Sequence, residues 1–289
     1  MNWVRNTESG NSKWWSWWVG IIVILVFYLV LGSIPAVIGT MNGLITLEPD
    51  GGMMSGAASP IQFALLMCSP ILLFVGVWVA QRAVHRRPFV SLLSAGTFRW
   101  PLVWNGMVIW LVMTMVSTAI ESVLYPGRYS WTFDFSQWIL IAPLVLLLIP
   151  IQAAGEELFF RGYLMQAIGR LRAHPVLLVL ASGVLFMLPH LSNPEMSGAL
   201  GGPIPMALNY FLMGIGLGWL SLRDNGIERA IGIHVVNNLY AGIFVGYANS
   251  VLSTPTLFEA NVIDAWFGVG TLVVSFAVIL FMKRYPTPG

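Results

Sequence analysis

Charged side chains are scarce in this chain. Asp, Glu, Lys and Arg make up 9% of its 289 residues, whereas hydrophobic residues make up 57%. Soluble globular domains carry roughly 25% charged residues, so the composition excludes a water-soluble globule and indicates a protein embedded in a bilayer. The net charge of +2 is too small to indicate binding to nucleic acid, and we expect no nucleic acid among the partners.

Cysteine is nearly absent as well. The single residue, Cys68, lies inside an apolar run, which excludes an internal disulfide framework, a cysteine-based zinc site and an iron–sulfur cluster. Long polar segments are also missing, since the longest connections, 39–59 and 82–100, are about twenty residues each. We therefore expect residues 1–289 to form a single membrane domain.

Long apolar runs are what the chain has in abundance. A helix needs about 20 consecutive apolar residues to cross a bilayer. The sequence therefore predicts an all-α fold, a polytopic membrane bundle of about eight transmembrane helices, with no repeat at a fixed period. The predicted spans are 17–37, 60–81, 101–124, 138–160, 175–192, 205–222, 230–249 and 262–282.

Basic residues lie on one side of this predicted bundle. Cytoplasmic loops carry an excess of Lys and Arg, so both the N-terminus and the C-terminus are predicted to be cytoplasmic. The basic residues on this side are Arg5, Lys13, Arg82, Arg86, Arg87, Arg99, Arg170, Arg172, Arg223, Arg229, Lys283 and Arg284. Arg128 and most acidic residues fall in or beside the opposite loops, the acids being Glu48, Asp50, Glu121, Asp134, Glu195, Glu259 and Asp264.

Few ionisable residues remain inside the spans, and each costs at least ~2.5–3.5 kcal/mol there, so they indicate function by default. In the stretch "GEELFFRGY", Glu157 and Arg161 are four residues apart and meet on one helix face. This pairing keeps Glu157 ionised and occupied. Glu156 points elsewhere, has no such local partner, and is the freer carboxylate for holding water and exchanging protons. The alternative is a structural ion pair beside a glutamate that extends towards the cytoplasm.

Two histidines lie in other spans, again in pairs with a spacing of four. "FMLPH" stacks Phe186 one turn before His190, and "HVVNN" places His234 and Asn238 on one face. Imidazole is the usual general base and the commonest metal ligand, and an imidazole beside an amide can also stabilise an oxyanion. Either pair alone is equally compatible with hydrogen bonding between helices.

Two further histidines, His85 and His174, are expected in cytoplasmic loops.

Together the three pairs resemble a known family. "EELFFRG", "FMLPH" and "HVVNN" match the EExxxR, FxxxH and HxxxN motifs, in the family's order, of the CPBP (CAAX protease and bacteriocin-processing) intramembrane proteases. This group contains the Ras-converting prenyl endopeptidase. The resemblance covers a core of about 138–250, and the remaining spans match only in hydropathy and number.

The resemblance implies a membrane endopeptidase in which Glu156 activates water with His190. Glu157 and Arg161 would brace the helix, and His234 with Asn238 would stabilise the oxyanion. Family members are commonly described as metalloproteases, so a divalent metal such as zinc, held by Glu156, His190 and His234, is one expectation. A metal-free glutamate mechanism is the other, because helical zinc signatures such as HExxH are missing.

The predicted substrate is a membrane-associated peptide or lipidated protein, processed as a CAAX target or as a bacteriocin or other peptide precursor. The alternatives are a non-catalytic immunity or partner-binding membrane protein and, less favoured, a transporter. The expected location is the plasma membrane of a prokaryote, as an integral multi-pass protein.

The depths of these residues agree only in part. At ~1.5 Å per residue, Glu156 lies ~21 Å along its helix from Arg170, and His190 lies ~24 Å from His174. His234, however, lies only ~8 Å from Arg229. The three residues can share a depth only if the seventh span begins deeper or the preceding helices protrude into the cytoplasm.

Overall fold

The computed structural model describes residues 3–45, 59–172, 174–196, 201–247, 250 and 254–282. Glu48, Asp50, Lys283 and Arg284, which entered the prediction of orientation, lie outside these residues. The helices are α1 (Trp14–Leu25), α2 (Ile34–Met41), α3 (Pro60–Val79), α4 (Val90–Leu93), α5 (Trp100–Leu124), α6 (Phe135–Glu157), α7 (Met165–Leu171), α8 (Pro175–His190), α9 (Pro203–Asp224), α10 (Glu228–Leu239) and α11 (Ala265–Phe281). π-helical segments extend or join several of them at Val26–Leu31, Ala80–Val84, Leu158–Leu164 and Tyr240–Phe244.

Several helices begin either with a proline, which has no backbone N–H to satisfy, or after a residue whose side chain accepts hydrogen bonds from the first free N–H groups. Pro60, Pro175 and Pro203 occupy first helical positions, where a missing N–H costs nothing. Asp134 accepts hydrogen bonds from the N–H groups of the first turn of α6. Because the capping residues flank uninterrupted apolar runs, the helices start close to the predicted boundaries.

The predicted polytopic bundle is confirmed. Five helical stretches are long and apolar enough to cross a membrane, and α8 and α11 are shorter apolar helices. The long stretches are Trp14–Met41, Pro60–Val84, Trp100–Leu124, Phe135–Leu171 and Pro203–Asp224. The seventh predicted span, 230–249, is helical only as far as Phe244 and then turns into a strand.

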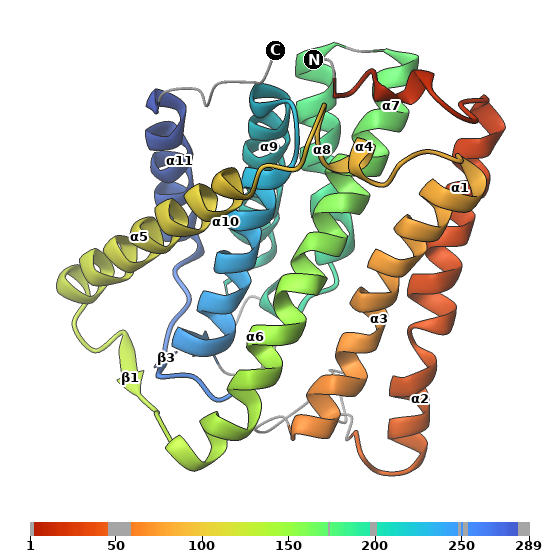
Figure 1. Cartoon of the computed structure of the whole chain (residues 1–289). Helices are drawn as coiled ribbons and strands as arrows, with labels where there is room; N and C mark the ends of the chain where they lie inside the picture. Colours follow the sequence, from red (N-terminus) through yellow and green to blue (C-terminus); the bar gives the residue numbers. More distant parts are fainter. Residues whose placement is uncertain are drawn as a thin grey trace.

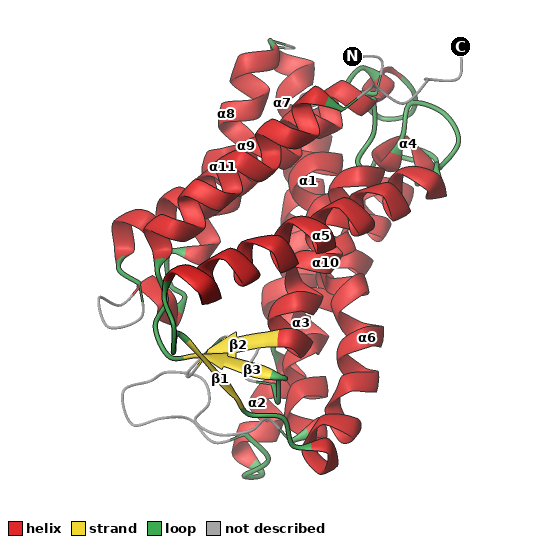
Figure 2. Ribbon diagram, turned by 90° about the vertical axis from the view of Figure 1, so that its left-hand side faces the viewer, coloured by secondary structure: helices red, strands yellow, loops and turns green. Residues whose placement is uncertain are grey.

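A small sheet departs from the all-α prediction. Strands β1 (Tyr129–Trp131), β3 (Phe258–Ala260) and β2 (Val245–Tyr247) pair in that order, with β1 antiparallel and β2 parallel to β3. The sheet lies at the end of the bundle opposite to both termini, which share one end (Figures 1 and 2). The cytoplasmic location of this end stays a prediction from the basic residues.

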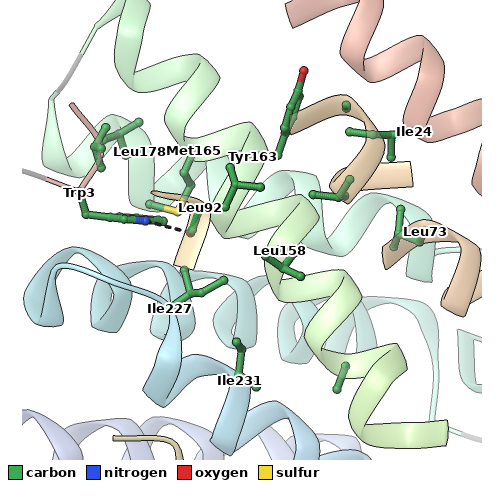
Figure 3. Packing of buried hydrophobic residues seen from close by; sticks show 14 of the residues in the cluster. Trp3, Ile24, Leu73, Leu92, Leu158, Tyr163, Met165, Leu178, Ile227 and Ile231 are labelled. Carbon is green, nitrogen blue, oxygen red and sulfur yellow. Dashed lines mark hydrogen bonds between the residues drawn. The ribbon is translucent and has the colours of Figure 1, made fainter. Parts of the chain in front are cut away.

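The core at the end of the bundle opposite to the sheet includes Trp3 and Val4 of the N-terminal segment. Trp3 is fully buried, and its indole N–H donates to the Leu92 carbonyl at 2.9 Å (Figure 3). Ile227 and Leu158 belong to the same apolar cluster. The N-terminal segment therefore ties α4, the start of α10 and the π-helical segment after α6 together.

His85 lies in the connection after the π-helical segment Ala80–Val84, as a loop residue, but it is fully buried there, which the sequence did not predict. Its Nδ1–H donates to the Asn11 carbonyl at 2.9 Å, and its Nε2 accepts from the Tyr163 hydroxyl at 2.8 Å. The reason is that the N-terminal segment folds back over the end of α3 and excludes water. Burial lowers the pKa of His85 to about 4. His174, in contrast, is exposed as expected.

Candidate active site

Glu157 is the centre of the first group of polar side chains. Its Oε1 accepts a hydrogen bond from Arg161 Nη1 at 2.6 Å and one from His234 Nδ1 at 2.7 Å. The side chains of Glu157 and Arg161 are 0% exposed. The predicted pairing within one helix is therefore present, and the same carboxylate also holds His234 of α10. This shared carboxylate fixes the tautomer of His234, because a carboxylate can only accept.

The ion pair lies at the junction of α6 and the π-helical segment Leu158–Leu164. Wide turns of this kind are frequent at functional sites because they reorient side chains along a helix. Here the segment carries Arg161, whose guanidinium also lies over the Phe186 ring, 4.4 Å from its centroid. The charged pair is thus enclosed by an aromatic ring from α8.

Glu156 forms the second group, and it does have a local partner, contrary to the prediction. Gln152, one turn earlier on α6, donates its amide to Glu156 Oε1. The other end of the Gln152 amide accepts from Asn238 Nδ2 at 3.0 Å. Glu156 Oε2 is left facing His234 Nε2 at 3.7 Å, with its side chain 17% exposed. Glu156 is therefore the more accessible of the two carboxylates.

His190 completes the site from the last residue of α8. Its Nδ1 lies 2.7 Å from the Phe186 carbonyl, which can only accept, so Nδ1 carries the proton and Nε2 carries the lone pair. Its ring packs on Phe186 as predicted, with centroids 4.7 Å apart, and Phe186 meets His234 edge-on at 5.6 Å.

The six predicted site residues therefore come from α6 with its π-helical extension, α8 and α10; five of them are joined by hydrogen bonds or ion pairs, directly or through Gln152, and His190 is linked to them through the Phe186 ring. Glu156 and Glu157 together carry two negative charges when ionised, and Arg161 carries one positive charge. A single further proton makes the group neutral. The charges of these three side chains therefore depend on one another, because an uncompensated charge in an apolar interior is costly.

Sequence reasoning missed several residues at the site. Gln152 is the only polar side chain in the run "WILIAPLVLLLIPIQAA" and lies one helical turn from Glu156, which is a signal that could have revealed it. Asn237 accepts from the Trp110 indole at 3.2 Å and bonds Asn238. Glu195, predicted in or beside a loop, lies in a connection between helices but is only 3% exposed.

The predicted metal ligands are Glu156, His190 and His234. Among the described residues, no group of three or more His, Cys, Asp or Glu side chains is arranged to hold a metal ion. Both histidines use Nδ1 for a hydrogen bond, and Glu156 faces only one of the two at close range. The donors as placed do not converge on one point, so we derive no step through a metal, and the metal site stays a prediction.

Comparison with known proteins adds independent evidence. Residues 136–240, which include every predicted site residue, match the family model described as type II CAAX prenyl endopeptidase Rce1-like. The uncharacterized protein YyaK of Bacillus subtilis (strain 168) is 31% identical over 290 residues, covering 96% of this chain and 94% of YyaK. No solved structure matches significantly. The chain therefore belongs to the Rce1-like family of type II CAAX prenyl endopeptidases, which are membrane-embedded proteases.

Proposed function

We propose that this protein hydrolyses a peptide bond with a water molecule activated by Glu156 and His190. The observation that carries the proposal is the division of labour between two adjacent glutamates. Glu157 holds both Arg161 and His234 through Oε1 and its side chain is 0% exposed, whereas the hydrogen bond of Glu156 goes to Gln152 and its side chain is 17% exposed. A purely structural ion pair would need no second carboxylate beside it.

In the proposed reaction, the water oxygen attacks the carbonyl carbon of the scissile bond while Glu156 accepts a water proton. His190 Nε2, which carries a lone pair, hydrogen-bonds the same water and orients it. The C–O bond forms as the carbonyl π electrons move onto oxygen. The C–N bond then breaks, and the proton held by Glu156 passes to the leaving amine, which gives a carboxylic acid and an amine.

The developing oxyanion needs donors that are already in place. His234 and the Asn238 amide are the candidates, since both lie on one face of α10 and are anchored from behind. Glu157 holds His234 Nδ1 and Gln152 holds the Asn238 amide. With the extra proton on Nε2, His234 donates to the oxyanion while Glu157 stabilises the resulting imidazolium. The Glu157 carboxylate thus links the ion pair with Arg161 to the proposed oxyanion donor His234.

We propose a short or lipid-borne peptide as the substrate. The connections between helices are short, so the chain offers little surface for recognising a large soluble protein. Both a prenylated CAAX peptide and an unprenylated membrane peptide fit these constraints.

The test uses the full chain purified and reconstituted in lipid vesicles. A farnesylated CAAX peptide and the same peptide without the lipid are each incubated with wild type and with Glu156→Gln. Cleavage is measured by mass spectrometry of the products. The expected result is cleavage by wild type and a loss of at least about a hundredfold in Glu156→Gln, as for removal of a general base.

A matched control is Glu259→Gln, which removes a carboxylate on β3 far from the site and should leave cleavage unchanged. Full activity of Glu156→Gln would refute the assignment. Absence of cleavage of a broad peptide panel by wild type would favour the non-catalytic partner-binding alternative. Repeating the assay with a chelator and with added zinc tests the predicted metal, and the variant comparison remains valid in either case.

A further inference from the structure

A third carboxylate lies at the site, outside the family motifs. Glu195 belongs to the short 3₁₀ helix Pro194–Met196 that follows α8, and it is 3% exposed. Its Oε1 accepts from the Tyr210 hydroxyl, and Asn193 Nδ2 donates to both of these groups, at 3.1 Å to Glu195 and 3.0 Å to Tyr210. An acid buried at this cost calls for a function.

Tyr210 links this acid to His190. The Tyr210 ring lies parallel to the imidazole, with centroids 4.2 Å apart and an interplanar angle of 25°. Phe186 covers another side of the imidazole at 4.7 Å. His190 therefore lies between two aromatic rings, one from its own helix and one from α9. The ring from α9 is held in place by Glu195.

His190 needs such support because of its place in the chain. It is the last residue of α8, and Pro189 before it has no N–H to bond the preceding turn. Helix ends fray unless contacts from elsewhere hold them. The Nδ1 bond to Phe186 fixes one edge of the ring, but it leaves rotation of the helix end free.

We infer that Glu195 and Tyr210 are positioning residues for His190, and that they act through the hydroxyl–carboxylate hydrogen bond and the ring stack. Glu195 fixes Tyr210, Tyr210 fixes the plane of the imidazole, and the imidazole then presents Nε2 to the water. The inference deepens the proposed function and rests on it for its kinetic consequence. The placement of His190 itself can be measured without any substrate.

The kinetic test compares four substitutions in the vesicle assay. Tyr210→Phe keeps the stack and removes the hydroxyl, and we expect kcat to fall about tenfold with KM within about twofold, because a slightly misplaced base slows chemistry more than binding. Glu195→Leu, which removes the acceptor for the Tyr210 hydroxyl, should lower kcat to the same extent as Tyr210→Phe. Tyr210→Leu also removes the stack and should cost about a hundredfold. Glu195→Gln keeps an acceptor for the hydroxyl and should restore kcat to within about threefold of wild type.

The matched control is Tyr240→Phe, which removes a hydroxyl that bonds Thr118 Oγ1 away from the site. Its kcat should stay within about twofold of wild type, as for a substitution outside the reacting groups. Tyr210→Phe and Glu195→Gln each alter a single polar group, so they remain informative if the leucine variants fail to fold. Equal kcat values for Tyr210→Phe and wild type, or a Glu195→Gln variant as slow as Glu195→Leu, would overturn the inference.

A second measurement separates this inference from the proposed function. The chain has four histidines, so ¹⁵N-histidine labelling gives few signals, and His190→Gln assigns the one of interest. Wild type should show His190 as a single ordered Nδ1–H tautomer in vesicles. Tyr210→Leu and Glu195→Leu should show a mixture of tautomers or a broadened signal. If both leucine variants give the same His190 signal as wild type, the positioning role is overturned. If the leucine variants change the His190 signal but wild type shows no peptidase activity, the proposed function is refuted and the positioning role stands.

Discussion

Removing the guanidinium of Arg161 gives the sharpest test of the buried brace. Arg161→Met keeps the length of the side chain but leaves the Glu157 carboxylate with only His234 as a partner. Both side chains of the ion pair are 0% exposed and their charged atoms are 2.6 Å apart. Breaking a buried pair by removing one partner costs about 3–5 kcal/mol, because the remaining charge is uncompensated.

Two features of the site refine this magnitude. His234 still donates to Glu157 at 2.7 Å, which brings the expected cost towards the lower end. The contact between Arg161 and the Phe186 ring, at 4.4 Å, is lost as well, and such contacts contribute about 0.5–2 kcal/mol. We therefore expect Arg161→Met to lower the free energy of unfolding by about 3.5–5 kcal/mol.

The double variant Glu157→Gln with Arg161→Met removes both charges together. Replacing a buried pair with uncharged groups is often close to neutral, so the double variant should recover most of the loss, with a coupling energy of at least about 2 kcal/mol. The measurement is unfolding by SDS in mixed micelles, followed by far-UV circular dichroism. Arg82→Met, at an exposed position, is the control and should change stability by less than about 0.5 kcal/mol.

The reasoning fails if Arg161→Met unfolds within about 1 kcal/mol of wild type, well below the range for a broken buried pair. It also fails if the two single substitutions simply add in the double variant, because additivity would mean that the groups do not interact.

Two further predictions concern neighbouring groups. Gln152→Leu removes the amide that joins Glu156 to Asn238. Its kcat for cleavage should fall about tenfold or more at similar KM. The control Gln137→Leu, at the exposed start of α6, should have no effect on cleavage. His85 is buried neutral, with a pKa lowered from 6.5 to about 4. The unfolded chain binds the proton first as pH falls, so stability should be full above pH 6.5 and drop by about 3 kcal/mol towards pH 4 in the micelle assay. His85→Asn should remove that part of the pH dependence, and an unchanged profile would contradict the assignment.

Pairs within one helix could be predicted from the sequence because their geometry is local. The contact between Glu157 and Arg161, and that between Phe186 and His190, follow from a spacing of four residues. The bond from His234 to Glu157 depends on how α10 is placed against α6, and no spacing encodes that.

The fold shows the same difference between local features, which the sequence predicts, and contacts between distant segments, which it does not. Apolar runs long enough to cross a bilayer predict helices directly. The three-residue strands of the sheet come from connections that are far apart in the sequence, and each is too short to produce a periodic pattern. Glu195 was taken for a loop acid for a similar reason, since it follows the end of α8 in a connection rich in Pro and Gly. Only tertiary packing shows that this connection turns inwards to Tyr210.

The level at which α10 begins explains why the depths of the three functional residues seemed to disagree. The stretch Phe135–Leu171 is 37 residues long, which is ~55 Å of helix, far more than the ~30 Å hydrocarbon core. A Cβ on Gly162 of this stretch would lie 3.7 Å from Ile227 Cδ1, so α10 begins level with Gly162. Along the two helices, ~9 Å separates Gly162 from Glu156 and ~10 Å separates Ile227 from His234, so the two residues share a depth.

The error came from using basic residues as markers of the membrane surface. Arg229 is 2% exposed and pairs with Asp224 at 2.8 Å, so it lies inside the protein and not at the level of the lipid headgroups. Arg170, on the protruding end of the long helix, is exposed. An excess of Lys and Arg indicates which side of the membrane a loop occupies, because insertion responds to charge. It indicates depth only where the charge reaches water, and that depends on packing that the sequence pattern does not reveal.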